Sequence, residues 1–155
     1  MQLTQGMLEQ LLDHHPVATL ATLGENQIIH QVPIVFVRHD DVFWSPIDGK
    51  PKSGGELARL RNIQRNPNVS LLLDSYQQDW SRLWWIRIEG IARVLQLNPD
   101  NKGQIAPVIE ALRSKHPQYQ EIPVLTDTAT LIKIKPNRVV SWCADINAVV
   151  VPDKE

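Results

Sequence analysis

The sequence has 155 residues, 43% of them hydrophobic and 21% charged, with a formal net charge of −1 at pH 7. This length suits one domain with its own core, and a single cysteine excludes both an internal disulfide framework and a cysteine-rich zinc module. The near-neutral charge argues against a nucleic-acid binder or an anionic-membrane binder, which would usually carry a basic excess.

The first predicted element is an amphipathic helix that ends before Pro16. Thr4 is its candidate N-cap, and four apolar residues at helical spacing share one face: Met7, Leu8, Leu11 and Leu12. The segment has no early basic cluster, so it does not resemble a signal peptide. No apolar run approaches the ~20 residues of a membrane-spanning helix. These features predict a cytoplasmic protein.

Three short strands are predicted next, at residues 17–23, 28–37 and 42–45, with turn-forming residues between them. Pro33 interrupts the second run and indicates an edge strand or a bulge, because proline cannot donate a hydrogen bond to a strand ladder. Two hairpins in succession indicate an antiparallel meander.

The second half of the chain mixes helices and strands. We expect helices at 56–65 and 102–115 and strands at 69–73, 83–97, 131–135 and 138–143. Gly90 indicates a bulge or a bend in the longest strand, and Pro107 must either lie in the first turn of its helix or break it. Because strands and helices do not alternate regularly, the pattern favours a small antiparallel barrel with peripheral helices over a doubly wound parallel sheet.

The segment 48–55, Asp-Gly-Lys-Pro-Lys-Ser-Gly-Gly, is the most informative stretch for function. Its glycines permit tight turns close to a ligand, while Lys50, Lys52 and the hydroxyl of Ser53 precede the N-terminus of a helix. This combination is typical of an anion site, most simply for a phosphate. The same residues could instead form a solvated basic turn that caps the helix. The spacing excludes a nucleotide-binding P-loop.

Tryptophan is the commonest aromatic residue, with five copies against two phenylalanines and two tyrosines. In a strand, the adjacent Trp84 and Trp85 must point to opposite faces, so they cannot both belong to one core. The nearby Arg82 and Arg87 favour a subunit interface or a planar ligand on one face, although plain packing is the commoner role of aromatic residues.

No group of side chains predicts metal binding or hydrolysis. The histidines and Cys143 lack the spacing of metal ligands, and neither a nucleophile elbow nor a carboxylate pair is evident. The remaining interpretation is a protein that binds a phosphorylated planar molecule and leaves the chemistry to that molecule.

The sequence resembles the pyridoxamine 5'-phosphate oxidase-like, FMN-binding split-barrel proteins. Four motifs in matching order carry the resemblance: His-Gln-Val-Pro-Ile-Val-Phe at 30–36, Phe-Trp-Ser-Pro-Ile-Asp-Gly-Lys-Pro-Lys at 43–52, Asn-Pro-Asn-Val-Ser-Leu at 66–71 and Glu-Gly-Ile-Ala-Arg-Val at 89–94. The Lys-Pro-Lys, Leu-Arg-Asn-Ile and Asp-Trp-Ser-Arg-Leu-Trp-Trp pieces are similar to a subgroup predicted to use a deazaflavin coenzyme in place of FMN.

The resemblance covers residues 10–97 best and implies both a fold and a site. The implied fold is a mainly β, six-stranded antiparallel split β-barrel with peripheral helices, formed by residues 1–155 as a single flavin-binding domain. It implies a homodimer in which two chains form each cofactor groove. The implied cofactor contacts are Val32, Pro33 and Ile34 on the second strand, Trp44, Ser45 and Pro46 on the third, Lys50, Lys52 and Ser53 around the phosphate, and Trp85 with Arg87 across the interface.

We therefore expect an oxidoreductase that binds FMN and transfers hydride to or from a small molecule, with no obligate acid or base among its side chains. Family members that oxidise pyridoxamine phosphate carry a basic residue near the positions of Val32 and Val37. Both residues are apolar here, so we do not expect that activity.

Three alternatives stay open. The first is a deazaflavin-dependent reductase of the same fold, and the second is a non-catalytic protein that binds flavin or haem. The third, single-stranded nucleic-acid binding through exposed tryptophan, conflicts with the net charge of −1. For the flavoprotein we expect Trp44 and Trp85 near the cofactor, Trp80 and Trp84 toward the interface or rim, and Trp142 in the closing strand.

Overall fold

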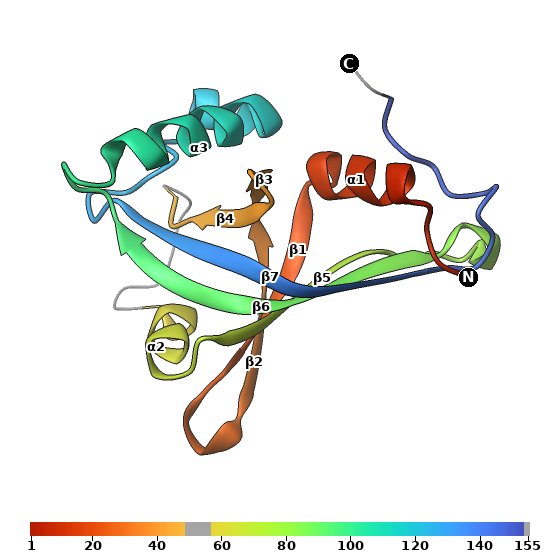
Figure 1. Cartoon of the computed structure of the whole chain (residues 1–155), viewed down its shortest axis with the longest axis horizontal. Helices are drawn as coiled ribbons and strands as arrows, with labels where there is room; N and C mark the ends of the chain where they lie inside the picture. Colours follow the sequence, from red (N-terminus) through yellow and green to blue (C-terminus); the bar gives the residue numbers. More distant parts are fainter. Residues whose placement is uncertain (49–56, 154–155) are drawn as a thin grey trace.

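A computed structural model of the chain describes residues 1–48 and 57–153. Figure 1 shows a strongly curved sheet with helices packed around it. The helices are α1 (Gln5–His14), α2 (Ala58–Arg65) and α3 (Lys102–Lys115), and the strands are β1 (Val17–Leu23), β2 (Ile29–Val35), β3 (Val37–His39), β4 (Val42–Pro46), β5 (Asn68–Ser75), β6 (Trp84–Gln96) and β7 (Thr130–Cys143). No helix within the described ranges is both long enough and apolar enough to cross a membrane.

The seven strands form one sheet in the order β2-β1-β5-β6-β7-β4-β3, with every neighbouring pair antiparallel. The two edge strands, β2 and β3, are consecutive in the chain and separated only by Phe36. The sheet must therefore curl until its two edges meet at this residue. The Oγ of Ser45 donates a 2.8 Å hydrogen bond to the carbonyl of Val35 and so joins β4 to β2 across the seam.

This architecture confirms the predicted class, an antiparallel split barrel with peripheral helices, with seven strands rather than six. The expected second strand breaks at Phe36 and not at Pro33. Pro33 lies within β2, where an edge position tolerates the missing donor. The two expected closing strands are one strand, β7, which passes through Pro136 and Asn137 without interruption.

Helix α3 begins and ends where the sequence predicts, but the expectation for Pro107 is wrong. Pro107 is the sixth residue of α3, beyond the first turn, and the helix continues through it. The hydrogen bond that proline cannot donate would have reached the carbonyl of Gly103, an exposed first-turn residue whose carbonyl water can satisfy.

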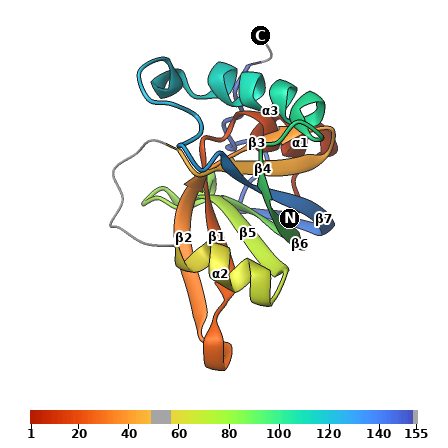
Figure 2. The same ribbon diagram turned by 90° about the vertical axis from the view of Figure 1, so that its left-hand side faces the viewer.

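Two apolar clusters hold the fold together. The larger one fills the barrel and extends under α1, and it includes Leu20, Leu71, Ile86 and Ile88, all with no exposed surface. The smaller one lies between α3 and strands β3, β4 and β7. Figure 2 shows α1 and α3 together at one end of the barrel and α2 crossing the strands below them.

The ladder is irregular at Gly90, as predicted, but the extra residue of the bulge is on β7 and not on β6. The register of β6 against β7 shifts between Glu89 and Gly90, so Asn137 is an extra residue between the pairs Gly90–Pro136 and Glu89–Arg138. A Cβ atom at Gly90 would lie 2.5 Å from the carbonyl oxygen of Lys135. The position therefore requires glycine for close backbone approach rather than for an unusual dihedral angle.

Candidate functional site

The predicted phosphate loop follows β4, and Lys50, Lys52 and Ser53 lie outside the described residues. The residue that precedes the loop, Asp48, is only 2% exposed, and its Oδ2 accepts a 2.6 Å hydrogen bond from the Tyr119 hydroxyl. Burial, and then this hydrogen bond, raise the pKa of Tyr119. One end of the loop is thus attached to the segment that follows α3.

The helix that follows the loop carries a cationic side chain, Arg59, close enough to Asp48 to respond to its charge. Arg59 lies in the first turn of α2 and is half-buried, and its Nε has no hydrogen-bond partner among the described residues. Burial lowers the pKa of Arg59, while the charge of Asp48 acts in the opposite direction. A buried guanidinium nitrogen without an acceptor is unfavourable unless a ligand supplies one.

Arg59 was not among the residues predicted from the sequence. Its signal was nevertheless present, because an arginine in the first turn of a helix that follows a glycine-rich loop can reach an anion bound there. Which of the three arginines of α2 is half-buried, however, depends on how the helix packs, and only the structure shows it.

The predicted contacts from β2 and β4 point in different directions. Val32 and Ile34 pack into the barrel core, whereas Pro33 is exposed on the edge strand. Ser45 and Pro46 are buried, and the Ser45 hydroxyl is used to close the barrel. Trp44 belongs to the second cluster, under α3. The predicted contact residues on β2 and β4 therefore do not all face one groove within this chain.

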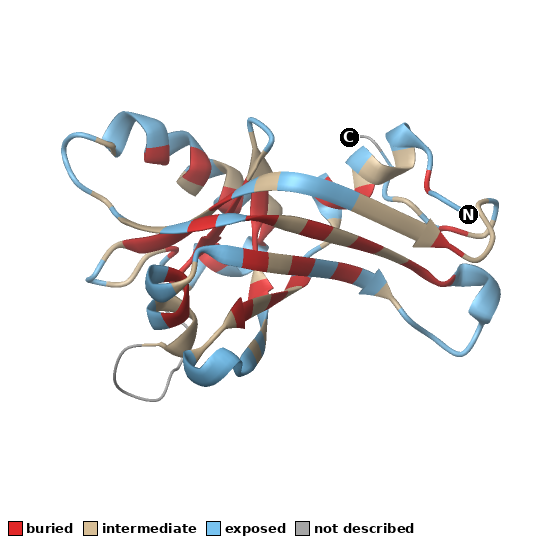
Figure 3. Ribbon diagram, turned by 60° about the horizontal axis from the view of Figure 1, so that its bottom comes forward, coloured by how far each residue is buried: buried red, intermediate tan, exposed pale blue. Residues whose placement is uncertain are grey.

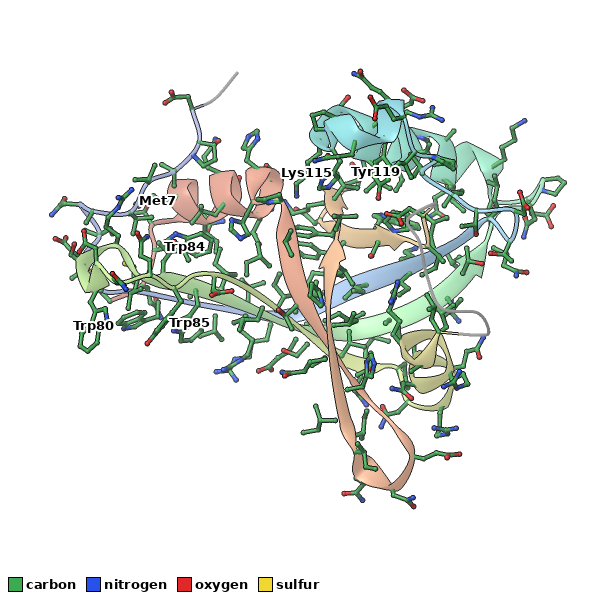
Figure 4. All side chains as sticks on the ribbon, turned by 180° about the vertical axis from the view of Figure 1, so that it is seen from behind. Met7, Trp80, Trp84, Trp85, Lys115 and Tyr119 are labelled. Carbon is green, nitrogen blue, oxygen red and sulfur yellow. The ribbon has the colours of Figure 1, made fainter. Side chains whose placement is uncertain are left out.

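The adjacent tryptophans of β6 do point to opposite faces, as predicted. Trp84 is 4% exposed and makes an edge contact with the ring of His15, 5.0 Å between centroids. Figure 4 shows Trp84 directed toward α1 and Trp85 on the other side of the sheet. The expectation that Trp84 lies toward the interface or rim is therefore wrong, because α1 covers it. Trp80 is 74% exposed.

Trp85 and Arg87 lie on the outward face of β5, β6 and β7. The Arg87 guanidinium is 5.7 Å from the centre of the Trp85 ring, and Trp85 pairs across the strands with Asp74 and Trp142. A pocket of about 260 Å³ is lined by Leu72, Asp74, Tyr76, Trp85 and Arg87. Figure 3 looks onto this face: α2 lies at one end of the strands, where it contacts β6, and no α-helix lies over the other end.

Trp85 and Arg87 lie away from Asp48, the residue that precedes the loop. Figure 4 shows Trp85 and Tyr119 toward opposite ends of the sheet, and Tyr119 contacts Asp48 at the base of the loop. The described residues thus fall into two separate groups, which we call half-sites: Asp48 with the buried guanidinium of Arg59, and Trp85 with Arg87.

Comparison with known proteins gives one family match and several solved structures of similar fold. Residues 5–143 match the family model described as pyridoxamine 5'-phosphate oxidase, and no curated protein matches the sequence. Among solved structures, the conserved hypothetical protein Rv2991 from Mycobacterium tuberculosis is 17% identical with a TM-score of 0.71, over 99% of this chain and 92% of that one. An FAD-binding protein from Mesorhizobium loti is 20% identical with a TM-score of 0.66, over 91% and 95% of the two chains. An F420 reductase is 18% identical with a TM-score of 0.57, over 84% and 94%. Identities this low show a shared fold.

Proposed function

The chain belongs to the pyridoxamine 5'-phosphate oxidase family, and from this premise we propose that it is a homodimeric oxidoreductase that binds FMN. The single observation that carries the proposal is the half-buried Arg59, whose Nε lacks an acceptor in the described chain and which lies in the first turn of a helix that follows a Lys-Pro-Lys segment. A cofactor phosphate would supply that acceptor.

The phosphate end of the cofactor would be held by Arg59 together with Lys50 and Lys52. Arginine and lysine attract a phosphate by charge, and the amide groups at the start of α2 add a partial positive charge. The Asp48 carboxylate accepts a hydrogen bond from Tyr119, and its negative charge opposes the lowering of the Arg59 pKa by burial.

The ring end would be closed by Trp85 and Arg87 of the partner subunit. An aromatic side chain on an uncovered sheet face offers a planar surface, and a nearby guanidinium stacks on it and can donate hydrogen bonds. When bound, the flavin ring supplies the redox chemistry by accepting or donating hydride. The protein then contributes binding, orientation and exclusion of water.

A deazaflavin coenzyme is the second candidate. It carries a comparable tricyclic ring and a phosphate, so the same cations could anchor it, and an F420 reductase shares the fold. Val32 and Val37 are apolar near the positions where true pyridoxamine phosphate oxidases carry a basic residue, which disfavours vitamin B6 oxidation and keeps the deazaflavin candidate open.

Cofactor titration tests the proposal. We expect FMN to bind at micromolar concentration, and Lys52→Ala and Arg59→Met each to weaken binding roughly tenfold or more, since a hydrogen bond to a charged group contributes about 1.5–3 kcal/mol. The measurement is flavin fluorescence quenching, with the deazaflavin titrated in parallel.

The control is Arg65→Met, in the last turn of the same helix, where Arg65 pairs with Glu25 at 3.0 Å. Its affinity should equal that of the wild type. Tighter binding of the deazaflavin than of FMN would select the second candidate, and binding of neither would reject both.

The dimer has its own test. Trp85→Glu places a charge on the uncovered face, and we expect the mass in light scattering to fall from twice 17.6 kDa toward 17.6 kDa, because burying an unpaired carboxylate strongly opposes association. Val150→Glu, at an apolar residue that is 64% exposed on the C-terminal segment, should leave the mass unchanged. A wild-type chain that is already monomeric would contradict the shared site.

A further inference from the structure

A buried contact connects the end of α3 to the proposed cofactor site. Tyr119 lies in the short 3₁₀ helix Pro117–Gln120 that follows α3, is 7% exposed, and packs in the cluster between α3 and the strands. Its hydroxyl donates the 2.6 Å hydrogen bond to Oδ2 of Asp48. Tyr119 is thus linked to the cationic half-site through this carboxylate.

The position of Tyr119 is itself fixed by buried neighbours. Its ring makes an edge contact with the ring of His116, 5.9 Å between centroids. His116 is 5% exposed, and its Nε2 donates to the carbonyl of Phe36, 2.9 Å away, at the break between β2 and β3. Because packing and a hydrogen bond restrain these rings, the Tyr119 hydroxyl has a defined place relative to the barrel.

The backbone next to Asp48 is held by other contacts. The N–H group of Ile47 donates to the carbonyl of Thr130, and the carbonyl of Ile47 accepts from the N–H group of Thr126. These two bonds fix the path of the chain without Tyr119. The hydroxyl of Tyr119 therefore restrains the direction of the Asp48 side chain rather than the backbone that carries it.

The direction of this carboxylate matters because a guanidinium lies within range of its charge. The charge of Asp48 opposes the lowering of the Arg59 pKa by burial, yet Arg59 Nε makes no hydrogen bond within the described part of the chain, to Asp48 or to any other group. Carboxylate and guanidinium groups pair readily. A carboxylate that could turn freely would compete with an incoming anion for the same N–H group.

We propose that Tyr119 is a positioning residue for the cofactor phosphate: its hydroxyl holds the Asp48 carboxylate away from Arg59 and so leaves the guanidinium open to the phosphate. This inference rests on the proposed function, in which Arg59 binds that phosphate. Tyr119 acts through Asp48 and not by contact with the cofactor. Burial raises the pKa of Tyr119, so the phenol stays protonated and remains a hydrogen-bond donor.

Parallel titrations with FMN and with riboflavin, which lacks the phosphate, test this role. Tyr119→Phe keeps the ring and removes only the hydroxyl. We expect it to weaken FMN binding about fivefold or more, because a charge-assisted hydrogen bond no longer restrains the competing carboxylate. Riboflavin should bind as it does to the wild type, since it offers Arg59 no phosphate, and its unchanged affinity also shows that the variant is folded. Flavin fluorescence quenching measures both.

A double variant separates positioning from a merely structural role. Asparagine has nearly the shape of aspartate but no charge with which to pair with Arg59, so Tyr119→Phe combined with Asp48→Asn should regain the wild-type preference for FMN over riboflavin. The matched control is Ser81→Ala, which removes a 2.7 Å hydrogen bond from a hydroxyl to the exposed carboxylate of Asp79. It should leave both affinities unchanged.

Three results would overturn the role of Tyr119: an unchanged affinity of Tyr119→Phe for FMN, equal losses for FMN and riboflavin, or a double variant that binds FMN as weakly as Tyr119→Phe. A wild-type chain that binds FMN no more tightly than riboflavin would instead reject the phosphate anchor of the proposed function. The riboflavin titration of the wild type therefore distinguishes the two failures.

Discussion

Replacing Gly90 with alanine should lower the free energy of unfolding by roughly 2–3 kcal/mol, the upper part of the range for inserting a methyl group into a packed interior. The added Cβ would lie 2.5 Å from the Lys135 carbonyl oxygen and 3.1 Å from Cγ2 of Ile134. Neither strand can easily move away, because β6 is also paired with β5 and β7 with β4. Chemical denaturation followed by circular dichroism measures the change.

Gly6→Ala is the matched control for this prediction. Gly6 lies in α1, and a Cβ there would meet nothing within 4 Å. Alanine is favoured over glycine in a helix by about 0.5–1 kcal/mol, so this variant should be slightly more stable than the wild type. Equal stability of the two alanine variants would show that the bulge can relax.

Local signals in the sequence predicted most of the fold. The cap at Thr4, the stop at Pro16 and the bulge at Gly90 follow from properties of single residues, and all three are present. The break at Phe36 could not be predicted this way, because residues 28–37 read as one continuous strand. The break arises from closure of the barrel, in which consecutive strands pair with opposite edges of the sheet.

The candidate site was predictable only in part, for a related reason. Alternation along a strand was enough to separate Trp84 from Trp85, but not to say which one α1 covers. The half-buried Arg59 and the unpartnered indole of Trp44 depend on how α2 and α3 pack against the barrel. The sequence indicates which groups a side chain can bind. Whether a polar atom of that side chain is left without a hydrogen-bond partner depends on the packing around it.

Lys115 is a buried cation that the sequence does not distinguish from the surface lysines. It lies in the last turn of α3, and its Nζ is 3.7 Å from the centre of the Phe36 ring and has no hydrogen-bond partner in the described chain. Burial lowers the pKa of Lys115 to about 7, with Asp13 opposing the shift and Arg38 adding to it. Figure 4 shows Lys115 in the space between α1 and α3.

This burial should make stability rise with pH. The pKa of Lys115 is about 7 in the folded chain and ~10.4 in the unfolded chain. Between these values the unfolded chain binds one more proton, so the free energy of unfolding increases as pH rises through this window. The unfavourable contribution of the buried ammonium is complete below pH ~7 and is progressively lost above it.

Lys115→Met should therefore stabilise the protein most at low pH. We expect its free energy of unfolding to exceed that of the wild type by on the order of 3 kcal/mol near pH 6, after the lost contact with Phe36 is taken into account. The difference should shrink steadily toward pH 10, and comparing the two proteins at each pH cancels the titration of all other groups.

Lys135→Met, at an exposed lysine, should show no such trend. An advantage for Lys115→Met that is constant from pH 6 to pH 10 would mean that the ammonium stays solvated, because only a lowered pKa in the folded chain couples this substitution to pH.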